Sequence, residues 1–400
     1  MVTAKEKKTV MVVAGEASGD MHGAGLVRAM RARNPGLDFC GMGGSELAAA
    51  GVEILFDAAR IAVVGITEVF SHLGDILKAR RILVERLRKS PPSLLVLIDY
   101  PDFNLLLGKT AKRLGIPILY YISPQVWAWR SGRAAKIAAI ADRIAVILPF
   151  EKDFYGRRGI EVDFVGHPLM DMVTTSVDTK TYLKKLSVPP GSRVIGLLPG
   201  SRRKEISSLL PVFLEAAVQL SSRSSHRFVF LLPRASTVSM TMLEESGLGE
   251  CGNTLDVRVV SESRYDMMAA CDAVVAASGT VTLELAILGI PMVAAYRISP
   301  RTYRLGRLLI SLPHMTLVNL VAGRQVVPEL IQDEVTAENI ATLIATFLSD
   351  DRVRRKMRRQ LCVVKGRLGR PGAADRTARL ACGMLSGKGV GSPILPGDRS

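Results

Sequence analysis

Glycine-rich turns and acidic residues follow several short apolar runs of this sequence, and these are the positions where chemistry could take place. The run TVMVVAG (9–15) leads into the loop GEASGD, where Gly15 and Gly19 permit a tight turn. The free backbone N–H groups of such a turn suit an anionic or polyhydroxyl ligand. Ser18 lies in the same loop, and the alternative is a plain strand-to-helix turn that Ser18 caps. The spacing matches neither a dinucleotide fingerprint nor a Walker loop.

A general base is wanted at the carboxyl end of a strand, because ligands of open α/β sheets bind outside those ends. Asp99 stands at such an end, in IDYPDFN, although strand-end aspartates often only satisfy the donors of a loop. Asp102 follows Pro101 and precedes an apolar periodic run, so it is typical of a helix start. The choice between the two carboxylates as the base stays open.

Two later loops have the residue types of a diphosphate and ribose site. Arg202 follows the run ending in LPGS, and its planar guanidinium suits a diphosphate, the alternative being a solvated basic loop. Ser278, Gly279 and Thr280 open a helical pattern whose free N–H groups can hold a phosphate. Glu284 can accept hydrogen bonds from ribose hydroxyls, or it merely caps the helix together with Thr280. The loops together predict a cleft between two domains.

The elements that must position these loops form an alternating pattern. Short β-branched runs ending in Gly or Pro alternate with longer helical patterns, which indicates an α/β fold with parallel sheets. The pattern occurs twice, and a Pro- and Gly-containing stretch, 166–192, separates the two series. We therefore expect two Rossmann-like domains, 1–168 and 169–345, then helices over 346–385 that pack back on the N-terminal domain, and a disordered tail over 386–400.

An apolar stripe with helical spacing runs through 60–81 and is followed by basic residues. Core packing is the default interpretation of such a stripe, and insertion into a membrane surface is the sharper alternative. The residues of the stripe are Ile66, Val69, Phe70, Leu73, Ile76 and Leu77.

Composition narrows the choice of partners. The 53 basic against 37 acidic residues give a net charge of +16, which favours anionic partners. The five cysteines and five histidines are scattered without metal-binding or disulfide spacing, so we expect no metal, no cofactor and a reducing cytosol. Every apolar stretch is well short of the ~20 residues that span a bilayer, and no signal-peptide core is present. A nucleic-acid-binding motif is also missing, which disfavours that class.

In order along about residues 10–345, these motifs closely resemble the lipid-A-disaccharide synthase family of inverting nucleotide-sugar glycosyltransferases. The distinctive segments are AGEASGD (14–20), IDYPDFN (98–104), YYISPQVWAWR (120–130), LPGSR (198–202) and ASGTVTLE (277–284). The resemblance implies a two-domain glycosyltransferase-B (GT-B) fold, in which the N-terminal half handles the acceptor and the C-terminal half binds the UDP-sugar.

The resemblance also implies a reaction and its residues. UDP-2,3-diacylglucosamine and 2,3-diacylglucosamine 1-phosphate (lipid X) would give the β-1,6-linked lipid A disaccharide 1-phosphate and UDP, at the cytoplasmic face of the inner membrane. Asp99 matches the proposed base, and Ser18 falls beside the reacting centre. The nucleotide side is matched by Arg202, Ser278, Gly279, Thr280, Glu284 and Asn319. A homodimer with exchanged C-terminal segments is suggested as well. The alternative activities are a muramyl-lipid glycosyltransferase and a UDP-N-acetylglucosamine 2-epimerase, from which the product discriminates.

Overall fold

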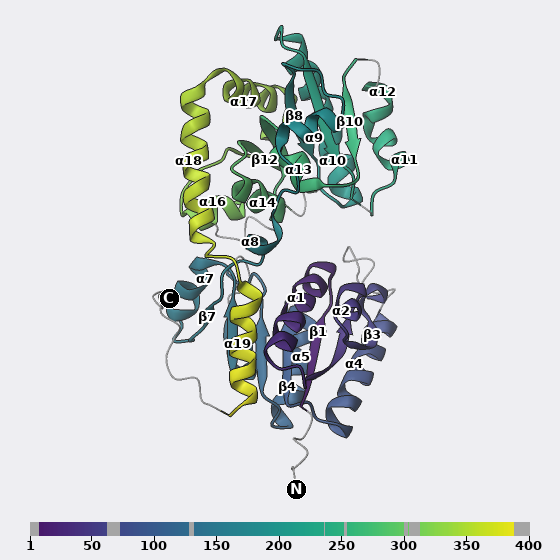
Figure 1. The fold of residues 1–400 in the computed structure, drawn as a ribbon, viewed down its shortest axis with the longest axis vertical. Helices are drawn as coiled ribbons and strands as arrows, with labels where there is room; N and C mark the ends of the chain where they lie inside the picture. The colour runs from purple at the N-terminus through teal and green to yellow at the C-terminus, as the bar shows by residue number, and fades with distance from the viewer. Residues whose placement is uncertain are drawn as a thin grey trace. The chain divides into compact units, whose positions relative to one another are not determined.

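The chain folds into two α/β units, which are coloured along the sequence in Figure 1. The computed structural model describes residues 8–61, 73–127, 132–235, 237–251, 254–299, 303 and 313–387. Unit 1 comprises Met1–Pro168 and Gly369–Ser400, and unit 2 comprises Leu169–Leu368. Each unit has its own parallel sheet covered by helices, so the predicted fold class is confirmed.

Unit 1 is built on a seven-stranded parallel sheet with the order β3-β2-β1-β4-β5-β6-β7. The central strands β1 and β4 are buried almost throughout, as expected for apolar runs that are covered on both faces. The strands are β1 (Thr9–Ala14), β2 (Asp38–Gly43), β3 (Glu53–Asp57), β4 (Leu94–Ile98), β5 (Ile118–Tyr121), β6 (Arg143–Val146) and β7 (Asp163–Phe164).

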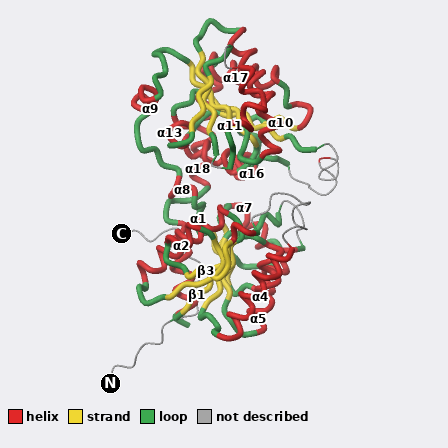
Figure 2. Tube along the Cα trace, turned by 90° about the vertical axis from the view of Figure 1, so that its right-hand side faces the viewer, coloured by secondary structure: helices red, strands yellow, loops and turns green. Residues whose placement is uncertain are grey.

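Helices cover both faces of this sheet. In Figure 2 the sheet lies between α1 and α2 on one side and α4 and α5 on the other. The C-terminal helix α19 packs against α1 and β4, while α4, α5 and α6 pack in sequence over the other face. The helices are α1 (Ala17–Arg33), α2 (Ser45–Ala49), α4 (Leu73–Lys89), α5 (Pro101–Arg113), α6 (Arg133–Ile140), α7 (Pro149–Gly156) and α19 (Ala373–Leu385), with a 3-10 turn η1 (Ala58–Arg60).

Unit 2 repeats the plan with six parallel strands in the order β10-β9-β8-β11-β12-β13. The strands are β8 (Arg193–Leu198), β9 (Phe228–Pro233), β10 (Val257–Val260), β11 (Ala273–Ala277), β12 (Met292–Tyr296) and β13 (Glu329–Ile331). The helical elements are α8 (Leu169–Met172), α9 (Thr179–Lys185), α10 (Arg203–Ser222), α11 (Met240–Leu243), η2 (Glu244–Leu248), α12 (Gly249–Cys251), α13 (Arg264–Ala269), α14 (Thr280–Leu288), α16 (Leu317–Ala322), η3 (Gln332–Glu334), α17 (Ala337–Ser349) and α18 (Asp351–Arg367).

The C-terminal helices are shared between the two units, which differs from the expectation that 346–385 would pack on the N-terminal domain. Helix α18 packs on α14, α16 and α17 in unit 2, because its apolar stripe of Met357, Leu361 and Val364 is buried there. Helix α19 packs on α1 in unit 1, and Arg33 holds Asp375 at 2.6 Å. Of the expected tail, residues 388–400 lie outside the described part of the chain.

In each sheet the strand order reverses once, next to the first strand of the unit. In unit 1 the chain steps outward from β1 in one direction through β2 and β3, and then returns to β1's other side as β4. In unit 2 the same reversal places β11 beside β8. The loops after such neighbouring strands diverge to opposite faces, which leaves a crevice at the carboxyl ends where ligands bind.

Candidate active site

The reversal in unit 1 brings together two loops that sequence analysis singled out. Strands β1 and β4 pair in parallel, with Ala14 opposite Ile98, so the glycine-rich loop and Asp99 leave the sheet side by side. Gly15 is buried against the ring of Tyr100, which a Cβ at position 15 would overlap. The glycine is therefore required by close approach of a side chain from the neighbouring loop.

The remainder of the glycine-rich loop starts helix α1. Glu16 is the N-cap residue and makes no side-chain capping hydrogen bond, while Ser18 is exposed in the first turn. The alternative that Ser18 caps the helix is therefore not what the structure contains. Gly19 packs on Ala14 and Ile98 at the base of the loop.

Asp20 has a structural task. Its carboxylate accepts hydrogen bonds from the backbone N–H groups of Gly44 (2.7 Å), Glu46 (2.9 Å) and Leu47 (3.2 Å) at the start of α2. The side chain thereby joins the loop after β1 to the loop after β2, and the residue is buried.

Asp99 is half-buried at the end of β4, and its pKa differs from that of a surface carboxylate. Burial and the nearby Glu16 carboxylate raise the pKa of Asp99 to about 6, against a partial opposing effect of the Tyr100 backbone N–H. A carboxylate with such a pKa is mostly ionised at neutral pH and is still basic enough to accept a proton in a reaction.

Asp102, the alternative base, lies in a different environment. Its side chain is 80% exposed in the first turn of α5 and pairs with Arg133. Asp102 is therefore a solvated charge at a helix start. Pro101 precedes it in the first turn of α5, where an acidic side chain is favoured by the helix dipole.

The backbone at Asp99 and Tyr100 adopts a conformation that side-chain-bearing residues rarely have. Both residues have φ of 44°, and Ile122 at the end of the neighbouring strand β5 has φ of 59°. Each such residue costs about 1–3 kcal/mol, which surrounding contacts must offset. Strain of this kind clusters at functional sites.

A second buried carboxylate of unit 1, Glu151, was not singled out from the sequence. It accepts hydrogen bonds from the backbone N–H groups of Leu148 (2.8 Å) and Ile147 (3.2 Å) at the start of α7. Burial raises its pKa to about 7, with those N–H groups opposing the shift. The signal in the sequence was a glutamate three residues after a helix N-cap, which indicates a capping role.

The reversal in unit 2 places the loop after β8 beside the loop after β11. Gly200 has φ of 109°, and Glu205 accepts from the backbone N–H groups of Ser201 (3.1 Å) and Arg202 (3.3 Å). The Arg202 guanidinium reaches Glu205 at 3.1 Å and is 61% exposed. An exposed guanidinium at a strand's carboxyl end is accessible to an anionic ligand.

Helix α14 begins directly after β11 with a bare N-terminus. Gly279 is the N-cap residue without a side-chain capping bond, and a Cβ there would meet nothing within 4 Å. Gly279 and Thr280 are both exposed, while Ser278 donates its hydroxyl to the carbonyl of Met315 at 3.3 Å. The open N–H groups and the positive end of the helix dipole suit a phosphate.

Glu284 lies one turn into α14 and is only 3% exposed. Its Oε1 accepts from Arg264, whereas its buried Oε2 has no hydrogen-bond partner among the described residues. Burial raises the pKa of Glu284, and the Arg264 charge opposes that shift. Glu284 is thus no capping residue, and its unpartnered Oε2 is an acceptor that a hydroxyl donor could satisfy.

Asn319, expected on the nucleotide side, is fully buried and uses its side chain within its own loop. Its Nδ2 donates to Val327 O (2.9 Å) and Glu329 Oε1 (2.8 Å), and its Oδ1 accepts from the N–H groups of Val326 (2.7 Å) and Val327 (3.0 Å). These bonds shape the loop between α16 and β13, and the expected place of Asn319 on the nucleotide side stays a prediction.

Part of the apolar stripe is exposed. Leu73 and Leu77 of α4 are 49% and 55% exposed, whereas Ile76 is partly buried and packs on the core of unit 1. The stripe is therefore not all core. Ile66, Val69 and Phe70 lie outside the described residues.

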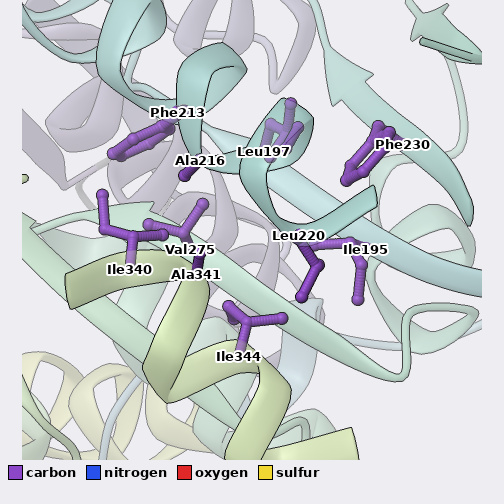
Figure 3. A pocket seen from close by; sticks show the side chains of 11 residues that line it. Ile195, Leu197, Phe213, Ala216, Leu220, Phe230, Val275, Ile340, Ala341 and Ile344 are labelled. Carbon is purple, nitrogen blue, oxygen red and sulfur yellow. The ribbon is translucent and has the colours of Figure 1, made fainter. Parts of the chain in front are cut away.

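The described part of the chain contains no cluster of three or more His, Cys, Asp or Glu residues placed to hold a metal ion. None of the helices described is long and apolar enough to cross a membrane. Figure 3 shows a pocket that is lined only by apolar side chains, among them Phe213, Val275 and Ile344. It lies where α10 and α17 pack on the sheet of unit 2, and it offers no group that binds a polar ligand.

Two Rossmann-like units with polar loops at their strand-order reversals have the fold of the GT-B class. Solved structures of this class share the fold. CalG4, a calicheamicin glycosyltransferase, matches with a TM-score of 0.61 at 15% identity, over 96% of this chain and 100% of that one. UDP-GlcNAc 2-epimerase from Neisseria meningitidis matches with a TM-score of 0.64 at 12% identity, over 94% and 99% of the two chains.

Relatives in sequence distinguish between glycosyltransferase and epimerase activity. A family model described as Lipid-A-disaccharide synthetase matches residues 10–378. The lipid-A-disaccharide synthase of Geobacter sulfurreducens is 48% identical, with 96% of this chain and 99% of that protein covered. That of Nitrosococcus oceani is 46% identical, with 96% and 97% covered. The chain belongs to the lipid-A-disaccharide synthetase family, so the predicted family and the predicted glycosyltransferase activity are confirmed.

The titration of Asp99 can be measured directly. In ¹³C-carboxyl NMR spectra, with Asp99→Asn for assignment, the Asp99 signal should titrate with a midpoint about 6. Glu16→Gln should lower that pKa, because it removes a negative charge that disfavours ionisation of Asp99. A midpoint near 4, unchanged by Glu16→Gln, would contradict this description of the site.

Proposed function

We propose that this enzyme joins UDP-2,3-diacylglucosamine to 2,3-diacylglucosamine 1-phosphate, which gives the β-1,6-linked disaccharide 1-phosphate and UDP. Family membership supports the reaction. The observation that carries the residue-level mechanism is the position and pKa of Asp99 at the strand-order reversal of unit 1. In this proposal unit 1 binds the acceptor. The N–H groups around Gly15 and Gly19 and the exposed hydroxyl of Ser18 face the polar groups of the acceptor.

In this mechanism Asp99 takes the proton of the acceptor 6-hydroxyl as that oxygen attacks the anomeric carbon of the donor. The attack inverts the configuration and expels UDP. Since the pKa of Asp99 is about 6, the group is ready to accept a proton at neutral pH. Turnover should decline as the pH falls through about 6, because Asp99 then becomes protonated and can no longer act as a base.

Unit 2 holds the leaving group in the proposal. Arg202 and the open N–H groups at Gly279 and Thr280 neutralise the charge that develops on the diphosphate, each donor contributing about 3 kcal/mol. Ser278 positions this loop, because its N–H donates to Ala295 O at 2.8 Å and its hydroxyl donates to Met315 O at 3.3 Å. Glu284, which is paired with Arg264 through Oε1, accepts a hydrogen bond from a ribose hydroxyl at its free Oε2. Asn319 shapes the adjoining loop.

Asp99→Asn should lower turnover by roughly 10²–10⁴-fold, because the general base is lost. The dissociation constant for UDP should stay within about twofold of that of the unchanged protein, since UDP is bound by unit 2. Release of UDP and calorimetric UDP titration measure the two quantities.

The matched control is Asp102→Asn, which changes the same group three residues away. It should retain turnover, because Asp102 is exposed and paired with Arg133. If Asp102→Asn abolished turnover and Asp99→Asn did not, Asp102 would be the base in place of Asp99.

We further propose peripheral attachment to a membrane surface, where diacylated substrates reside. Leu73 and Leu77 supply exposed apolar side chains in unit 1. In unit 2, α18 exposes a row of cations that suits anionic headgroups, namely Arg352, Arg355, Lys356 and Arg359.

The combined Leu73→Glu and Leu77→Glu substitutions should weaken binding to vesicles of mixed neutral and anionic phospholipids at least tenfold, because each inserted leucine contributes roughly 1.5 kcal/mol or more. Vesicle co-sedimentation measures the effect. Leu106→Glu, on a leucine of α5 that is 50% exposed, is the control and should bind as before. Equal binding by all three proteins would refute insertion at α4.

A further inference from the structure

The turn between β4 and α5 is held in its rare conformation by buried side chains that the mechanism above does not use. Asp99 and Tyr100 both have φ of 44°, so the chain leaves β4 through two successive left-handed residues that carry side chains. This turn decides where the Asp99 carboxylate points, because the direction of a Cα–Cβ bond is fixed by the backbone on either side of it.

The carbonyl oxygen of Asp99 is held by two donors from different elements. Asn104, on α5, donates its Nδ2 to Asp99 O at 2.8 Å and to Ile98 O at 3.1 Å. Tyr120, on β5, donates its hydroxyl to Asp99 O at 2.8 Å. The backbone N–H of Asp99 in turn donates to Ile122 O at 3.2 Å. Both peptide groups of Asp99 are therefore fixed.

Asn104 and Tyr120 are both 0% exposed. A buried asparagine in a helix is a poor choice for helix propensity, and a leucine would serve packing alone. Burial and the charge of Asp99 raise the pKa of the Tyr120 hydroxyl well above its ordinary value, so this group remains a donor. The two polar side chains share one acceptor, the main-chain oxygen of Asp99.

We propose that Asn104 and Tyr120 are positioning residues of the transfer reaction, which hold the left-handed turn at Asp99 and Tyr100 and so aim the Asp99 carboxylate at the acceptor hydroxyl. This inference rests on the proposed role of Asp99 as the base. Without these hydrogen bonds the turn relaxes toward the ordinary β or right-handed region, and the carboxylate turns away from the acceptor.

The test uses Tyr120→Phe, which removes one hydroxyl, and Asn104→Leu, which replaces the amide by an apolar side chain of similar length. Each variant should lower kcat by about tenfold or more, since small displacements of a reacting group have effects of this size. KM for both substrates and the Kd for UDP should stay within about threefold of those of the unchanged protein.

A purely structural role is distinguished by repeating both changes in the Asp99→Asn protein. Positioning residues act through the carboxylate, so neither change should lower the residual rate further in that background. Thr110→Val is the matched control, because Thr110 is a buried polar residue of α5 whose hydroxyl donates to Leu106 O of the same helix at 3.4 Å. It should keep kcat even where thermal unfolding shows some loss of stability.

Wild-type kcat in folded Tyr120→Phe and Asn104→Leu proteins would overturn the inference. So would an equal loss in the Asp99→Asn background, which would indicate damage to the fold instead. Full activity of Asp99→Asn itself would overturn the proposed base, whatever the other variants do, so the two failures are distinguishable.

Discussion

The strand-order reversal in each parallel sheet is the constraint on which the rest of the structure depends. After β1 and β4 the chain turns toward opposite faces of the sheet, and the same is true after β8 and β11, so a crevice where ligands bind is left at the carboxyl ends of these strands. The glycine-rich loop, Asp99, Arg202 and the start of α14 all occur at these ends. A parallel sheet with one reversal of strand order thus has an edge where ligands can bind, whatever side chains its loops carry.

Burial raises the pKa of two carboxylates, one in each unit, beside neighbouring charges of opposite sign. Burial and the charge of Glu16 raise the pKa of Asp99 to about 6, which suits the general base that we propose. Burial also raises the pKa of Glu284, and there the charge of Arg264 opposes the shift. Arg264 donates to Oε1 of Glu284, so Oε2 is left without a hydrogen-bond partner among the described residues and suits the ribose contact that we propose.

Local patterns in the sequence were sufficient to predict the two-domain α/β fold and the loops at strand ends, because strand runs, glycine turns and helix starts are short-range features. They were not sufficient for interactions that join distant segments. Asn104 and Tyr120 share the Asp99 carbonyl only because β5 lies beside β4, and Asn319 is saturated only because its loop closes on Val326 and Val327. The division of the C-terminal helices likewise depends on which core buries the apolar stripe of α18.

The central claim is that the loops at these sheet edges carry out disaccharide formation without a metal ion. Its most direct test supplies the purified protein, in mild detergent and EDTA, with UDP-2,3-diacylglucosamine, with and without 2,3-diacylglucosamine 1-phosphate, and identifies the products by mass spectrometry. The account predicts UDP release that depends on the acceptor and a tetraacyl disaccharide 1-phosphate as the lipid product. UDP binding without that product, or a monosaccharide epimer as the product, would contradict it.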